Sequence, residues 1–271
     1  MPCKIEYEHD DSPDQRVREK IEKWANYNRF KHIKVTPQAQ IIIEDQLVKL
    51  SSKAWQQNDN GNPCIPFEII YVRNLEFTCA FHDADMLYSS FPRIVENSLL
   101  FSVGKMPPGV TDLSFIGEHT RDEVELKNVL ITSNRGLVTL KGCPQWANSV
   151  EISRNADLTN LTGITKHIDA ELTISMNPKL TSFHNIHQHI KFIGSHLIID
   201  GCVQRDILGL LLIDGLESIL LDHNDGRSPS EDLRRSINIL NKYLKEPPSS
   251  HRLLDCYEEM LEVGLSKYAR I

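Results

Sequence analysis

The sequence predicts an α+β repeat fold: a solenoid with a parallel sheet, preceded by an N-terminal helical region and closed by a C-terminal two-helix cap. Two observations carry this prediction. One pattern recurs five times between residues 129 and 224, and two amphipathic segments follow its last copy. A period in the low twenties is typical of solenoids, whose units pack only against their neighbours. We expect three regions: 1–68, a solenoid at 69–227 that becomes regular from 129, and a cap at 228–271.

Five segments share the repeat pattern. They read VLITSNRGLVTLKG from 129, VEISRNADLTNLTG from 150, LTISMNPKLTSFHN from 172, LIIDGC from 197 and ILLDHN from 219. Their starts lie 21, 22, 25 and 22 residues apart. Alternation of apolar and polar residues in each segment predicts a strand, and the regular spacing predicts that the strands pair in parallel.

One polar position recurs where each predicted strand ends. This repeat slot is filled by Asn134, Asn155, Asn177, Cys202 and Asn224. Asn or Cys at this position is typical of leucine-rich repeats, because the buried side chain must satisfy backbone groups that are freed where the strand turns. We therefore expect the slot residues to be buried and the asparagines to bond to backbone.

The chain before residue 129 is less regular. Residues 13–30 have the apolar spacing of an amphipathic helix, HIKVT at 32–36 is predicted to be extended, and a second helix is predicted from Pro37 to Ala54. FEIIYV and LEFTCAF then have the composition of strands. An L-x-F motif is expected to mark degenerate repeats at Leu75–Phe77, Leu99–Phe101 and Leu113–Phe115.

Two helices are predicted after the last repeat. Ser230 is expected to cap the first, which has Leu233, Ile237, Leu240 and Leu244 at helical spacing and ends before Pro247-Pro248. The second is predicted to begin at Ser250 and to end at Gly264, with an apolar face made by Leu253, Leu254, Tyr257 and Leu261. These helices can cover the open apolar end of the solenoid.

The repeats and the tail together resemble a known group of proteins. Units of the form N-x-x-L-T-x-L-x-G, followed by INILNKYL and LLDCYEEMLEVGLSKYARI, are similar to leucine-rich-repeat-like proteins encoded by large tailed bacteriophages. The resemblance covers Val129 to Ile271, a little over half of the chain. It implies the architecture and a phage origin, and it transfers no catalytic residue.

Composition narrows the classes of partner and compartment. The net charge of −7 disfavours binding to nucleic acid, which needs a basic face. No apolar run has the length of a membrane span, and six scattered cysteines without a C-x-x-C pair favour free thiols in a reducing compartment. We expect a cytoplasmic protein, in the host cytoplasm if phage-encoded, without a membrane partner.

A histidine cluster in the longest repeat unit is a candidate metal site. Its members are His184, His187, His189 and His196, and imidazole is a common ligand of transition metals. The alternative is a polar loop on the convex side of the solenoid. No nearby Cys or carboxylate completes a ligand set, so the loop is favoured and no metal is expected.

Two acidic motifs are weaker candidates. FHDAD places His82 beside Asp83 and Asp85, but alternation along a strand would separate these side chains, and a turn is the favoured interpretation. DHNDG at 222–226 lacks the terminal Glu of an EF-hand loop. No nucleophile elbow, phosphate-binding glycine loop or H-E-x-x-H motif occurs, so we expect neither an enzyme nor a cofactor.

The sequence favours a non-enzymatic protein–protein interaction module that engages a host factor or another phage protein. The side chains between the inward-facing residues should form one rigid outer face. On it, the expected partner-binding residues are Glu151, Ser153, Thr173, Ser175, Asp200 and Asp222. Two alternatives remain: an enzyme or nucleic-acid-acting domain in the N-terminal part with the solenoid as a targeting arm, and a structural component of a virion.

Overall fold

The computed structural model describes residues 94–122, 124–222 and 229–270 continuously, and selected residues before them. These are 4–7, 32–35, 47–50, 56–57, 63–64, 71–77, 84, 87–88 and 91. The predicted helix at 13–30 and the FHDAD residues His82, Asp83 and Asp85 lie outside the described residues.

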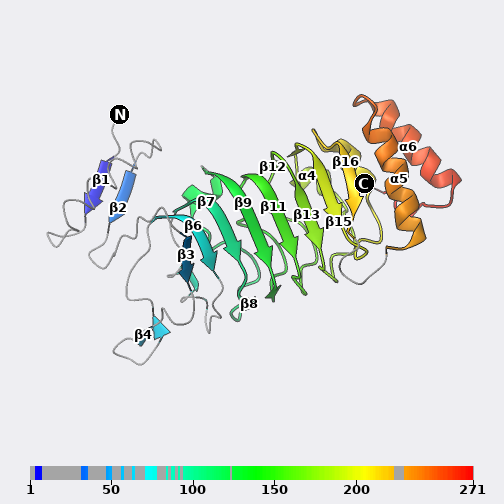
Figure 1. Cartoon of the computed structure of the whole chain (residues 1–271). Coiled ribbons are helices and arrows are strands. Elements are labelled where there is room, and N and C mark those ends of the chain that lie inside the picture. Colours follow the sequence, from blue (N-terminus) through cyan, green and yellow to red (C-terminus); the bar gives the residue numbers. More distant parts are fainter. Residues whose placement is uncertain are drawn as a thin grey trace.

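One long parallel sheet organises the described part of the chain (Figure 1). Its strands lie in the order β3–β6–β7–β9–β11–β13–β15–β16. Their bounds are β3 Leu47–Leu50, β6 Tyr71–Phe77, β7 Ile94–Phe101, β9 Glu125–Thr132, β11 Trp146–Ser153, β13 Leu172–Ser175, β15 His196–Ile199 and β16 Ser218–Leu221. From β7 to β16 each strand joins its neighbour through one coil of chain, so this part of the fold is a parallel β-solenoid.

The register of the five repeats is as predicted. Val129 pairs with Val150, Val150 with Leu172, Leu172 with Leu197, and Leu197 with Ile219, all in parallel. These residues and those two positions later, from Ile131 to Ile199, are buried in the core. A slip of one residue would expose this apolar set, which explains why the sequence pattern fixes the register.

Several shorter strands complete the coils. They are β8 (Gly104–Lys105) with β10 (Asn134–Arg135), and β12 (His167–Ile168) with β14 (Phe192–Ile193); β12 also pairs with β11. Short helical turns fill other connections, namely α3 (Glu118–Asp122), α4 (Ile186–His189) and the 3₁₀ helix η2 (Leu208–Leu212).

The chain before residue 94 corrects two predictions and confirms another. Residues 47–50 form β3, paired in parallel with β6, so the predicted helix from Pro37 to Ala54 is wrong there. The sheet thus begins ahead of residue 69. The extended segment 32–35 is confirmed as β2 (His32–Val35), which pairs with β1 (Lys4–Tyr7). β4 (Gln56–Gln57) and β5 (Pro63–Cys64) pair in antiparallel fashion.

The L-x-F motifs are repeats in two of their three copies. Leu75 pairs with Leu99 and Phe77 with Phe101, in β6 and β7. The third copy, Leu113–Phe115, is buried but lies in a turn before α3 rather than in a strand. The two segments predicted to be strands, FEIIYV and LEFTCAF, overlap one strand in the described residues, β6.

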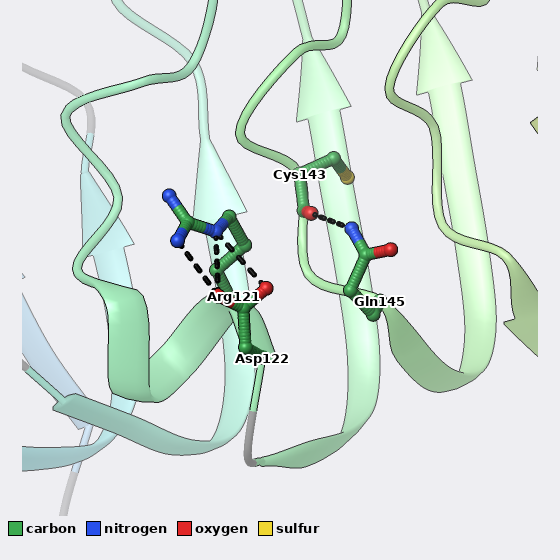
Figure 2. Close-up of polar contacts among 4 residues, drawn as sticks. All are labelled: Arg121, Asp122, Cys143 and Gln145. Carbon is green, nitrogen blue, oxygen red and sulfur yellow. Dashed lines mark hydrogen bonds and ion pairs between the residues drawn. The ribbon is translucent and has the colours of Figure 1, made fainter.

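A ladder of backbone bonds closes the corner where each coil enters its strand. The amide of Gln145 donates to the carbonyl of Arg121, Lys166 to Gln145 and Lys191 to Lys166. Figure 2 shows two of these corners: the Arg121 guanidinium pairs with Asp122, and the Gln145 side-chain amide donates to the Cys143 carbonyl at 3.2 Å. The Arg121 partner also lowers the pKa of Asp122.

Two helices cover the end of the sheet at β16 (Figure 1). α5 (Glu231–Leu244) contacts β16, and both α5 and α6 (Ser250–Glu262) contact η2. Ser230 caps α5 as predicted, because its Oγ accepts a bond from the Leu233 amide at 3.2 Å. The predicted apolar face of α5 is buried, and the predicted start of α6 and its end near Gly264, which has a positive φ of 79°, are also confirmed.

The described helices include no span that is both long and apolar enough to cross a membrane.

Candidate functional site

The register of the outer face runs through Glu76 of β6 and Leu100 of β7, and β9, β11, β13, β15 and β16 then add five side chains to it. In order across the strands they are Leu130, Glu151, Thr173, Ile198 and Leu220. The first four are half-buried and Leu220 is 44% exposed. Because neighbouring strands lie about 4.8 Å apart, the row spans about 19 Å. It offers a polar centre between apolar ends, and we call it the outer row.

A second row lies one pleat nearer the ends of the strands. It contains Thr132, Ser153 and Ser175, which pair across β9, β11 and β13. Ser153 Oγ donates to Glu151 Oε1 at 2.7 Å and lies 2.9 Å from Thr132 Oγ1. This network fixes the Glu151 carboxylate on the sheet, so a partner meets it in one position.

The six predicted partner-binding residues were expected to be exposed on the outer face, and this prediction is wrong for three of them. Ser153 is 4% exposed, Ser175 is 8% exposed and Asp200 is 1% exposed. The two serines are small side chains on a crowded sheet, where their neighbours cover them. Glu151, Thr173 and Asp222 remain half-buried and can be reached from solvent.

Asp200 has a structural role that the sequence pattern did not reveal. Its carboxylate accepts bonds from the amide of Met176 and from the amide of Cys202 at 2.9 Å. It therefore satisfies one backbone amide of the third unit and one of the fourth, close to the slot position. Cys202 is buried at the slot position of this unit.

The repeat slot is confirmed as a buried ladder for its three asparagines. Asn134, Asn155 and Asn177 are at most 1% exposed. Asn134 and Asn155 each donate their amide N–H to the Oδ1 of the next asparagine, at 3.1 and 3.0 Å. The Nδ2 atoms donate to strand carbonyls, as from Asn155 to Ile131 at 2.9 Å. The fifth slot residue, Asn224, lies outside the described residues.

The structure does not bring the four histidines together. His196 lies on the sheet, where its Nδ1 is 2.9 Å from Ser218 Oγ, whereas His184, His187 and His189 lie in and beside α4. Burial is the main cause that lowers the pKa of His187 and of His189, and the nearby Lys191 lowers both further. Among the described residues, no group of three or more His, Cys, Asp or Glu side chains is placed to hold a metal ion.

His184 and His189 instead line a polar cleft of about 390 Å³ between two successive coils. The extra residues of the third unit, which include α4, form one wall. The other wall is the turn of the preceding unit, with Thr159, Asn160 and Thr162. Several of these polar groups are already paired, since Thr162 donates its amide to Asn160 Oδ1 at 3.0 Å. The sequence signal for this cleft is the longer spacing of 25 residues at this unit.

An aromatic row follows the coil corners. Trp146, His167 and Phe192 pair in register, and the rings of Trp146 and His167 are stacked with centroids 5.7 Å apart and an angle of 10° between planes. Stacked rings present their edges rather than their faces, so this row does not form the open platform on which a sugar or base would stack. We interpret it as part of the coil-to-coil packing.

The cysteine thiols of the described coils and cap are buried. Burial raises the pKa of Cys143 to about 11 and that of Cys256 to about 12. Since the thiolate is the reactive form, neither side chain is placed to act as a nucleophile.

Comparisons of the chain with protein-family models, curated proteins and solved structures give no match.

Proposed function

We propose that this chain is a leucine-rich-repeat-like binding solenoid that holds a protein partner on the outer row of its sheet. The observation that carries the proposal is the register of that row, in which Glu151 and Thr173 lie between Leu130 on one side and Ile198 and Leu220 on the other. Apolar side chains beside a fixed polar centre are what a protein interface combines.

The rigidity of the surface supports binding. The strands β9, β11, β13 and β15 are each paired with a strand on both sides, and Ser153 donates to the Glu151 carboxylate. Few side chains would lose freedom on association, which lowers the entropic cost of binding. The asparagine ladder beneath the strand ends keeps successive coils in register.

The charge of the row selects the kind of partner. Among the five side chains the ionisable one is Glu151; Asp222 lies near one end of the row, and Glu76 is in register beyond the other end. Together with the net charge of −7, this favours a protein that presents a cation or hydrogen-bond donor opposite Glu151 over a phosphate backbone. A host factor or another phage protein is the partner that the sequence resemblance implies.

A capture experiment tests the proposal. The immobilised chain is incubated with host lysate, and retained proteins are compared with those on a Glu151→Arg/Thr173→Trp variant. The control variant, Glu246→Arg/Thr162→Trp, makes the same chemical changes at exposed positions away from the outer row. We expect the outer-row variant to lose a protein that the control retains, with both variants showing the wild-type circular dichroism spectrum. Equal capture by the two variants would contradict the proposal.

A further inference from the structure

The buried face of α6 is not the one that the apolar pattern predicts. Arg252, Cys256 and Met260 are buried against the rest of the cap. The Arg252 guanidinium donates to the carbonyls of Leu211 and Glu246, which explains how a charged residue is accommodated there. The predicted apolar face is therefore wrong for most of its members, and only Leu253 packs against the core in part.

Three large apolar side chains of α6 consequently face solvent. Leu254 is 51% exposed, Tyr257 39% and Leu261 40%. Their spacing of i, i+3 and i+7 places them in one line along the helix, which we call the α6 stripe. Figure 1 shows α6 on the side of α5 away from the sheet, so the described residues leave this line uncovered.

An acidic edge runs along the same stripe. Each stripe residue is followed directly by an acid, and these are Asp255, Glu258 and Glu262. Successive residues lie about 100° apart around a helix, so the three carboxylates share one side of the stripe. All three are exposed, and none forms an ion pair with a side chain of the described segments.

We infer that the α6 stripe binds a basic amphipathic helix of a partner protein. The apolar line offers the i, i+3, i+7 contacts into which such a helix packs, and the acidic edge faces Lys or Arg side chains along the border of the partner helix. This surface shares no residue with the outer row, so the inference does not rest on the proposed function.

Charge also decides against a second copy of this chain as the occupant. A two-fold axis that pairs two α6 helices in antiparallel fashion places both acidic edges on the same side, where like charges meet. The net charge of −7 on each copy adds to this repulsion. A cationic helix meets neither obstacle.

Two synthetic peptides test the inference on the full chain. Both are helical peptides of about 14 residues with leucines at i, i+3 and i+7 spacing. One carries lysines on its polar face and the other glutamates. With fluorescence anisotropy as the measurement, we expect the lysine peptide to bind at least about tenfold more tightly than the glutamate peptide, a factor that 1.4 kcal/mol provides.

Matched variants separate the stripe from general attraction to an acidic protein. Leu254→Ser/Leu261→Ser should weaken binding of the lysine peptide about tenfold or more, whereas Leu212→Ser, at another exposed leucine, should not. Glu258→Lys/Glu262→Lys should weaken it more than Asp214→Lys/Glu217→Lys, which changes the net charge equally on the last coil. Equal binding of both peptides, or undiminished binding by the leucine variant, would overturn the inference. So would a concentration-dependent dimer in sedimentation that Leu254→Ser/Leu261→Ser abolishes, because the occupant would then be a second copy.

Discussion

Asn155 shows how one side chain holds three coils together. Its Nδ2 donates to the carbonyl of Ile131 in the preceding unit, and its Oδ1 accepts the amide of Asn134. Its own amide donates to Asn177 Oδ1 in the following unit. A buried amide is suited to this position because it offers a donor and an acceptor on one short side chain.

Replacing this side chain tests the ladder at a single residue. Asn155→Leu removes the acceptor of the buried Asn134 amide and one donor to the Ile131 carbonyl, and a buried group that is left unpaired costs about 1 to 3 kcal/mol. We expect urea unfolding to show a fall of at least this size. Asn148→Leu, at an exposed asparagine of β11, should change the free energy of unfolding by less than about 0.5 kcal/mol. Similar stability of the two variants would mean that the ladder bonds contribute nothing net.

The histidines of α4 predict a dependence of stability on pH. The folded-state pKa values of His187 and His189 are lowered, chiefly by burial. The unfolded chain therefore takes up protons first as the pH falls below about 6.5. Their contribution to stability is present above that pH and is lost as the pH falls through the folded-state values.

A double variant isolates this contribution from the other titrating groups. Between about pH 7.5 and about pH 5, His187→Gln/His189→Gln should lose less free energy of unfolding than the wild type. His251→Gln, at an exposed position in α6, should follow the wild type. If the double variant has the wild-type pH profile, these histidines are not the destabilising groups.

At the scale of elements, α5 ends the solenoid by supplying the bonds that a further strand would make. Asn241 Oδ1 accepts the amide of Ile219 at 2.7 Å, and its Nδ2 donates to the Ile219 carbonyl at 2.8 Å. A side chain on a helix thus occupies part of the free edge of β16. This arrangement protects an edge that would otherwise invite pairing with another chain.

Removing the Asn241 amide should expose that edge. Asn241→Ala leaves two backbone groups of Ile219 unsatisfied, for a loss of about 1 to 3 kcal/mol per group that remains buried. Asn238→Ala, one turn earlier on the exposed side of α5, is the matched control and should be nearly neutral. Thermal unfolding of both variants, with light scattering to detect association through β16, measures the effect. An Asn241→Ala variant as stable and as monomeric as the control would show that the edge needs no cap.

Elements with a periodic pattern of apolar residues could be predicted from the sequence. Features that depend on contacts between residues distant in the sequence could not. Register followed from the alternation around Val129 and its equivalents, because one face of the sheet must be buried. The buried face of α6 could not be predicted in the same way, because apolar residues lie on two sides of this helix. The buried side is the one that carries Arg252, whose guanidinium bonds to two backbone carbonyls. The role of Asn241 could not be predicted from the sequence, because its bonding partner, Ile219, lies 22 residues away in β16.

The candidate site was predicted only in part for a related reason. Alternation identified which side of the strand Glu151 and Thr173 occupy, and the structure places them in the outer row. Alternation does not report how far neighbours cover a small side chain, so Ser153 and Ser175 were assigned an exposure that they lack. Asp200 was misassigned because β15 ends at Ile199, one residue earlier in register than β13, and the Asp200 carboxylate bonds to the Cys202 amide instead of facing out.

At the scale of the whole molecule, the described chain is a long parallel sheet with two helices at its β16 end. The coils share one continuous apolar core, and the two helices close it after β16. In a solenoid each unit is stabilised by its neighbours, so the outer row depends on the asparagine ladder and on the cap as well as on its own strands. We propose that a partner binds the outer face of the sheet that this packing supports.

The most direct test of this proposal is site-specific photo-crosslinking in a cell lysate. A photoreactive amino acid is placed at Thr173 in the centre of the outer row, and at Thr162 on the opposite, cleft-lining side as the control. We predict a discrete crosslinked protein from position 173 that is absent from position 162 and that disappears when Glu151→Arg is added. No adduct at position 173, or the same adduct from both positions, would contradict the claim that the outer row is the binding surface.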